Sequence, residues 1–177
     1  MRDGAHRADA APARLRRAGI ALLLFAGLGA QDMNEGGEPK IGPTEDRVGL
    51  PADYRTSFTR LRTTPVNAAQ VLVVYANEQA ASVTDRANLP YPYGSVFVAE
   101  WRYAEGQPRA GELFQIDVMR RGEGFGAAYG DVRSGEWEYV RYRTDRSHLV
   151  PPGHSGWCAA CHRNAGEARD FVFRGRF

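Results

Sequence analysis

The sequence predicts an α+β domain in which most of the chain forms antiparallel β-strands, with a few short helices between them. Short runs rich in β-branched and aromatic residues recur along the chain, and several of them alternate apolar with polar residues. Clusters of Pro and Gly separate these runs and divide the chain into short elements. The pattern differs from the four amphipathic helices of a helix bundle.

Five segments are expected to be strands. The segment 95–103 (SVFVAEWRY) follows a turn of Pro and Gly residues at 90–94 and is strongly apolar. In 136–143 (EWEYVRYR), charged and aromatic residues alternate, as in a strand with one exposed face. The expected strands are residues 70–75, 95–103, 113–120, 136–143 and 171–173.

The expected helices are short. Residues 77–82 suit a brief helix, and residues 156–168 suit a C-terminal helix after the Pro-Pro-Gly break at 151–153. Residues 53–62 form either a short helix or a turn that leads into a strand, and their composition does not separate the two.

The first 30 residues have the layout of a secretory signal peptide. Five arginines precede an unbroken apolar run at 20–26, and small residues follow at 27–30. The run is shorter than the roughly 20 residues that span a bilayer, although an uncleaved membrane anchor remains the alternative. We therefore expect a signal peptide at 1–30, a flexible polar tether at 31–49 and one folded domain at 50–177. The mature protein is expected to be periplasmic and not membrane-spanning.

The charge balance argues against nucleic acid as a partner. Residues 1–30 contain five Arg and two Asp, and without them the 23 basic and 21 acidic residues become 18 and 19, a net charge of −1. No basic stripe of the kind that binds nucleic acid remains. Lys40 is the only lysine in the chain.

Cys158, Cys161 and His162 form the C-x-x-C-H pattern of haem attachment. Cysteines three residues apart lie on one face of a helical turn, within reach of the two vinyl groups of a haem. The next residue, His162, is then placed to bind the iron as an axial ligand. The motif predicts one covalent haem c per chain, with His162 as the metal ligand.

Other uses of the two cysteines remain open. A Cys158–Cys161 disulfide would suit an exported protein. A zinc site would have to recruit His148 and His154 beside the cysteines. A thioredoxin-type motif would need a βαβ context, which the sequence lacks. Only 15 residues follow His162 and none of them is Met, so the arrangement with an axial Met downstream of the motif is excluded.

Several segments, taken in order, resemble the cytochrome P460 family. The similarity covers about residues 50–177, and the ordered set is more specific than the haem motif alone. The matching segments are residues 50–55 (LPADYR), 74–77 (VYAN), 92–100 (PYGSVFVAE), 157–162 (WCAACH) and 170–173 (DFVF).

The resemblance implies a mostly antiparallel β fold, a homodimer and a five-coordinate haem c. In well-known members a lysine is cross-linked to the porphyrin and the enzyme oxidises hydroxylamine. Ala99 occupies the position of that lysine, so we expect no cross-link. The loop 152–156, where the resemblance implies a catalytic carboxylate, contains none. Relatives without the cross-link bind nitric oxide or carbon monoxide in an apolar pocket.

If Ala99 faces the haem, Phe97 and Trp101 face it too, because side chains alternate along a strand. Such a wall would be dry and would suit small neutral gases. The alternative for Phe97 and Trp101 is simple core packing. His154 is a candidate proton donor or sixth ligand, with a surface position as the alternative. Met119 is a further sixth-ligand candidate.

The leading hypothesis is an exported mono-haem c-type cytochrome with an open axial iron site that binds nitric oxide or another small ligand. A second hypothesis is an electron-transfer cytochrome with His154 or Met119 as sixth ligand, working with a redox partner protein. A third is an oxidoreductase acting on hydroxylamine or nitric oxide. A protein without haem, holding zinc or a disulfide, is the fourth.

Overall fold

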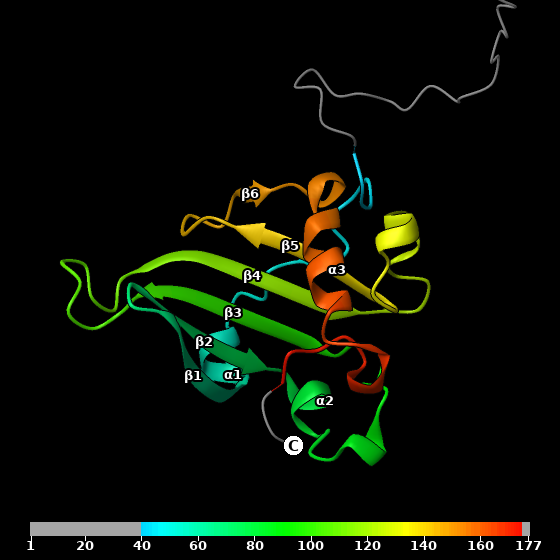
Figure 1. Cartoon of the computed structure of the whole chain (residues 1–177), viewed down its shortest axis with the longest axis horizontal. Coiled ribbons are helices and arrows are strands. Elements are labelled where there is room, and N and C mark those ends of the chain that lie inside the picture. Colours follow the sequence, from blue (N-terminus) through cyan, green and yellow to red (C-terminus); the bar gives the residue numbers. More distant parts are fainter. Residues whose placement is uncertain (1–39, 175–177) are drawn as a thin grey trace, which may run out of the picture. The chain divides into compact units, whose positions relative to one another are not determined.

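The computed structural model describes residues 40–174, which form a six-stranded antiparallel sheet with a few short helices (Figure 1). Each strand pairs with its neighbour in sequence, in the order β1-β2-β3-β4-β5-β6. This confirms the predicted fold class. The strands are β1 (Thr59–Asn67), β2 (Gln70–Ala76), β3 (Val96–Tyr103), β4 (Leu113–Arg121), β5 (Trp137–Tyr142) and β6 (His148–Val150).

The helical elements are all short. Residues 53–62 contain both of the expected alternatives, because a single helical turn leads directly into β1. The α-helices are α1 (Tyr54–Ser57), α2 (Glu78–Ala81) and α3 (Gly156–Arg163), and the 3₁₀ turns are η1 (Arg86–Asn88), η2 (Ala127–Val132), η3 (Pro152–His154) and η4 (Glu167–Arg169).

The strand expected at 171–173 does not form. Asp170 and Phe171 have φ angles of 47° and 59°, in the left-handed region, so the backbone turns where a strand would have to be extended. Asp170 is tied down by its neighbours: its Oδ2 accepts a hydrogen bond from the Tyr91 amide at 2.9 Å and lies 3.3 Å from Arg121 Nε. The turn replaces the strand and brings the Phe171 carbonyl oxygen to the His162 ring.

The sheet is covered on both faces. On one face, Phe97, Met119, Trp137 and Tyr139 pack with Ala159 of α3. Figure 1 shows α3 lying across this face, over β4 and β5. On the other face, the alternate residues of the same strands pack against Val48 and Tyr54 from the start of the domain. These residues are Val96, Val98, Ile116, Val118, Val140 and Tyr142.

The folded domain begins earlier than expected. The predicted tether ran from 31 to 49, but residues 40–49 pack on the domain. Val48 is buried, and Asp46 accepts a hydrogen bond from Tyr142 of β5. A side chain at Gly156 would meet Ile41 at 2.7 Å, which shows how closely this segment approaches the start of α3. The predicted signal peptide and the rest of the tether, at 31–39, lie outside the described residues.

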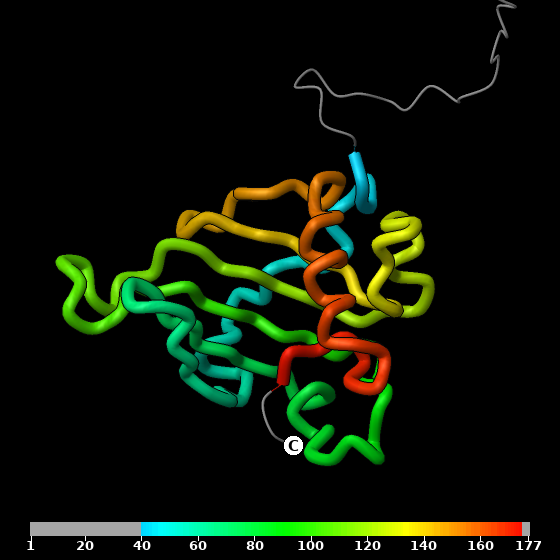
Figure 2. Tube along the Cα trace, in the orientation of Figure 1, coloured from blue at the N-terminus to red at the C-terminus, as the bar shows by residue number. Residues whose placement is uncertain are grey.

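The C-terminal segment lies next to the connection between β2 and β3. Figure 2 shows residues 164–174 beside the stretch that contains α2 and η1. The Tyr91–Asp170 hydrogen bond and a contact from Arg174 to the Val83 carbonyl oxygen join the two segments. Among residues 40–174, no helix has the length and apolarity needed to cross a bilayer.

Candidate functional site

Helix α3 presents the haem-attachment residues to a cavity of about 670 Å³. Cys158, Cys161 and His162 all line this cavity, and both cysteines are free thiols. Burial, and then the negative charge of Asp117, raises the pKa of the Cys158 thiol to about 12, so the group is protonated at neutral pH. The helix expected at 156–168 begins at Gly156 as predicted but ends earlier, at Arg163; in it Cys158 is partly buried and Cys161 is exposed.

A buried tyrosine fixes the start of α3. The Ser155 hydroxyl donates to the Pro152 carbonyl oxygen at 2.6 Å, which uses its only hydrogen. The Tyr129 hydroxyl, 2.9 Å from the Ser155 oxygen, must therefore donate to it. The same Tyr129 oxygen accepts from the Tyr139 amide of β5 at 3.1 Å. This chain of hydrogen bonds ties the entrance of α3 to the sheet beneath it.

The imidazole of His162 is held in one tautomer. Its Nδ1 lies 2.8 Å from the carbonyl oxygen of Phe171, and because a carbonyl only accepts, Nδ1 carries the hydrogen. The neutral ring then has a lone pair on Nε2, as a metal-binding histidine requires. Burial lowers the pKa of His162, against the opposing effect of this hydrogen bond, so the ring is neutral at pH 7. The left-handed turn at Asp170 and Phe171 delivers the carbonyl oxygen.

Aromatic rings hold the imidazole in place. Its centroid lies 4.7 Å from that of Tyr139 and 5.3 Å from that of Phe173. Tyr139 donates to or accepts from the Ser134 hydroxyl at 2.7 Å, so this supporting ring is itself fixed. The orientation of His162 is therefore set by contacts with the Tyr139 and Phe173 rings and by a hydrogen bond at Nδ1.

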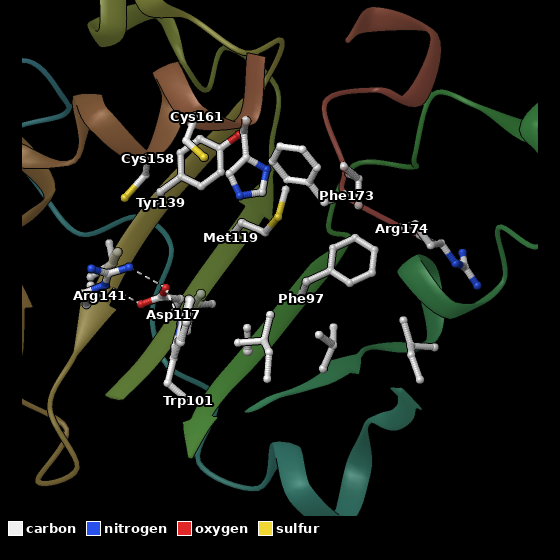
Figure 3. Close-up of a pocket in the computed structure, with 18 of the residues that line it drawn as sticks. Phe97, Trp101, Asp117, Met119, Tyr139, Arg141, Cys158, Cys161, Phe173 and Arg174 are labelled. Atoms are coloured by element: carbon white, nitrogen blue, oxygen red, sulfur yellow. Dashed lines mark hydrogen bonds and ion pairs between the residues drawn. The ribbon is translucent and has the colours of Figure 1, made fainter. Parts of the chain in front are cut away.

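The strands supply the opposite wall of the cavity (Figure 3). Phe97, Ala99 and Trp101 of β3 all line it, in the alternation that the sequence predicts. Phe97 also packs edge-to-face on Tyr91, with centroids 5.3 Å apart. Position 99 is alanine, and Lys40 is not among the lining residues. The complete lining is Leu61, Arg62, Leu72, Val74, Phe97, Ala99, Trp101, Asp117, Val118, Met119, Tyr139, Val140, Arg141, Trp157, Cys158, Cys161, His162, Val172, Phe173 and Arg174.

The wall is less uniformly apolar than expected, because Asp117 of β4 lies directly opposite Ala99 in the sheet register. Asp117 is ion-paired with Arg141 of β5, which donates from Nε to Oδ1 and from Nη2 to Oδ2, each at 2.7 Å. Trp101 Nε1 donates to Oδ2 at 2.8 Å. Figure 3 shows this cluster at the end of the cavity near Cys158.

Asp117 was not predicted as a site residue, although the alternation along β4 places it with Met119. In 113–120 (LFQIDVMR), Asp117 shares a face with Met119, while Ile116 and Val118 share the other. A carboxylate normally marks the solvent face of a strand. Here both faces are covered, so the alternation alone does not reveal which set meets the cavity.

The other candidate residues lie in different places. Met119 lines the cavity, whereas His154, in η3, is not among the lining residues. His148, in β6, is 2.9 Å from Asp46 through its Nε2. The described part of the chain contains no group of three or more His, Cys, Asp or Glu side chains placed to hold a metal ion. A role for His154 at the haem stays a prediction.

The residues present fit a haem. The cavity lies within the usual volume range of small-molecule sites and is mostly apolar. One wall carries two free thiols at the attachment spacing and a neutral imidazole with Nε2 left to bind iron. Cys158, Cys161 and His162 would hold the group.

Comparison with known proteins agrees with this geometry. The sequence model of the family described as Cytochrome P460 matches residues 51–174, which is most of the chain and the whole of the sheet. A search of curated proteins finds no match. Membership of this family implies a haem cofactor. From the thiols and imidazole of α3, the cavity that they line and this match, we conclude that the chain belongs to the cytochrome P460 family.

Proposed function

We propose that the chain is an exported mono-haem c-type cytochrome whose open axial position binds nitric oxide or another small neutral ligand. One observation supports the proposal most directly. Cys158, Cys161 and His162 line one wall of a mostly apolar cavity, and the opposite wall, which the sheet supplies, contains no lysine. The haem iron supplies the ligand-binding and redox chemistry. The protein attaches the haem, orients His162 and excludes water.

The protein supplies two free thiols for the attachment. Cys158 and Cys161 would hold the group covalently: each thiol would add across one haem vinyl group, forming a C–S and a C–H bond in place of its S–H bond and the carbon–carbon π bond. No oxidant or leaving group is involved, and the reaction requires free thiols, as Cys158 and Cys161 are. Trp157 stacks on Arg141, with the guanidinium carbon 4.3 Å from the ring centroid, and so braces the start of the motif.

The charges on the opposite wall favour neutral ligands. The negative charge of Asp117 is balanced by the two hydrogen bonds from Arg141. The Trp101 N–H is also used by Asp117, so the indole does not offer this donor to a ligand. Because the polar groups satisfy one another, the space beside Phe97 and Ala99 suits a small uncharged molecule.

Optical spectra test the proposal. The protein, produced together with haem c maturation factors, is measured oxidised, reduced, and reduced under carbon monoxide. We expect a high-spin haem c spectrum that shifts with carbon monoxide and lacks the red-shifted band of a cross-linked porphyrin. A reduced protein whose spectrum does not change with carbon monoxide would contradict the proposal of an open site. Met119→Leu serves as the matched variant, because it keeps the volume but removes the sulfur.

Met119 is the observation that favours an electron carrier as the second candidate. Its side chain lines the cavity from β4 and is its only thioether in the described residues. If its sulfur is the sixth ligand, the spectrum is low-spin and indifferent to carbon monoxide, and Met119→Leu converts it to a high-spin, carbon monoxide-binding form. A high-spin wild type rules this candidate out.

Asp117 favours a third candidate, an oxidoreductase acting on hydroxylamine or nitric oxide. A carboxylate in the cavity is a group that could accept a substrate proton, although it first has to be released from Arg141. Turnover of hydroxylamine with an artificial electron acceptor, lost in Asp117→Asn, would support this candidate. No turnover in the wild type would exclude it.

Export, a redox partner and a homodimer complete the proposal. The predicted signal peptide implies a mature chain that lacks about 30 N-terminal residues, and the mass of the periplasmic protein tests this. The resemblance of the sequence to cytochrome P460 proteins supports a homodimer. Light scattering of the haem-loaded protein distinguishes a dimer from a monomer.

A further inference from the structure

Three arginines line the cavity, and they differ in their hydrogen-bond partners. Arg141 is held at both oxygens of Asp117. Arg62, on β1, donates to the carbonyl oxygen of Phe173, and Arg174 donates to that of Val83. Among residues 40–174, Arg62 forms no ion pair with a carboxylate, and the positive charge of Arg174 lies near it.

Arg62 and Arg174 form a partly buried pair of like charges. Burial lowers the pKa of Arg62, and the positive charge of Arg174 lowers it further. Arg174 is also 3.4 Å from the Tyr91 hydroxyl. Two guanidinium groups that repel each other in a partly buried site are stabilised by an anion that binds both.

An irregularity in β1 aims Arg62 at the cavity. Arg60 pairs with Tyr75 and Arg62 with Val74, so β1 has one extra residue at Leu61. In a regular strand, neighbouring side chains point to opposite faces, yet Leu61 and Arg62 both line the cavity. A β-bulge of this kind re-aims a side chain, and it is often found next to functional sites.

We propose that Arg62 and Arg174 form an anion subsite that binds the propionate groups of the haem. The inference rests on the proposed attachment of haem at Cys158 and Cys161. In a haem, the pyrroles that carry the vinyl groups lie opposite those that carry the propionates. Figure 3 shows Cys158 with Asp117 and Arg141 at one end of the cavity and Arg174 at the other end, beyond Phe173. Guanidinium groups match carboxylates in both charge and hydrogen-bond geometry.

Arg141 is the competing site, and the structure argues against it. To bind a propionate, Arg141 would have to give up two hydrogen bonds of 2.7 Å to Asp117. The negative charge of Asp117 would then lack its counter-charge and would lie beside the negatively charged propionates. Arg62 is hydrogen-bonded to the Phe173 carbonyl oxygen and, among the described residues, to no carboxylate, so binding a propionate would break no ion pair at Arg62.

The test uses resonance Raman spectra and midpoint potentials of the haem-loaded protein. We expect Arg62→Gln to shift the propionate bending band and to lower the midpoint potential, because loss of a positive charge favours the oxidised iron. Arg62→Lys keeps the charge and should restore most of the potential while leaving the band shifted. Arg60→Gln is the control, because Arg60 lies exposed on the same strand, bonds to Thr63 and does not line the cavity.

The outcomes separate this inference from the proposed function. If the wild type carries covalent haem but Arg62→Gln matches it in both measurements, the propionate subsite is overturned. The same conclusion follows if Arg141→Gln, rather than Arg62→Gln, shifts the propionate band. A wild type without covalent haem would overturn the proposed function as well.

Discussion

The carbonyl oxygen of Phe171 accepts a hydrogen bond from Nδ1 of His162 at 2.8 Å. The bond joins the haem motif to the C-terminal segment nine residues later in the chain. It depends on the left-handed conformations of Asp170 and Phe171. The segment after α3 is therefore part of the iron-ligand assembly, although it contributes no ligand of its own.

Asp170→Ala should weaken this assembly. Asp170 is bound by the Tyr91 amide and Arg121, and without it the turn loses its anchors. A looser hydrogen bond makes His162 a weaker base, so we expect the Fe–His stretching frequency to fall and the midpoint potential to rise. The exposed Glu167→Ala in η4 is the control. An unchanged Fe–His frequency in Asp170→Ala would contradict this account of the turn.

Tyr129→Phe should destabilise the entrance of α3. It removes the hydroxyl that donates to Ser155 and accepts from the Tyr139 amide, and it leaves buried polar groups unpaired. The expected loss is about 1–3 kcal/mol in the free energy of unfolding, measured with denaturant. Tyr93→Phe should cost far less, because Tyr93 is half-exposed and bonds to Glu136 at the surface. Equal losses in the two variants would be inconsistent with this role.

Glu100 links folding stability to pH. Burial alone would raise its pKa, but hydrogen bonds from Tyr54, Arg55 and Arg102 outweigh burial and hold the pKa below its ordinary value. A carboxyl with a lowered pKa contributes stability above its unfolded-state pKa, about 4.3, and loses it as pH falls through the folded-state pKa. Glu100→Gln should therefore be less stable than the wild type at pH 7, with a gap that narrows at more acidic pH. A gap that is constant down to acid unfolding would contradict this linkage.

Asp117→Asn should change which ligands enter the cavity. The substitution leaves the Arg141 guanidinium without its carboxylate, so the cavity becomes more positive. We expect the ferric protein to bind azide several-fold to about tenfold more tightly, since one unscreened charge contributes on the order of 1 kcal/mol. Binding of neutral carbon monoxide by the ferrous protein should change little. Azide affinity equal to that of the wild type would show that the pair does not set the charge of the cavity.

The sequence predicted the sheet well because its strands have strong local patterns. In β3, the apolar run 95–103 and the turn before it match the observed strand to within a residue. Alternation also places Phe97, Ala99 and Trp101 on one face of β3, and all three line the cavity. A prediction of this kind needs only the period of two residues and a bounding turn.

Long-range contacts explain what the sequence did not reveal. Asp117 reaches the cavity because the register of β3 and β4 places it opposite Ala99, and strand register is not visible in either segment alone. The segment 171–173 has the composition of a strand, but the contacts of Asp170 with Tyr91 and Arg121 favour a turn. Residues 40–49 have the composition of a polar linker, yet Val48 is buried against the sheet. In each case tertiary contacts decide against the local pattern.

The most direct test of the central claim is the mass of the denatured protein and of its peptides. We expect one haem to stay with the chain after denaturation and acid extraction. We also expect it to be found on the peptide that contains Cys158, Cys161 and His162. Cys158→Ala with Cys161→Ala should abolish this mass. A haem that is extracted from the unfolded wild-type chain, or a wild-type chain that never acquires one, would contradict the account.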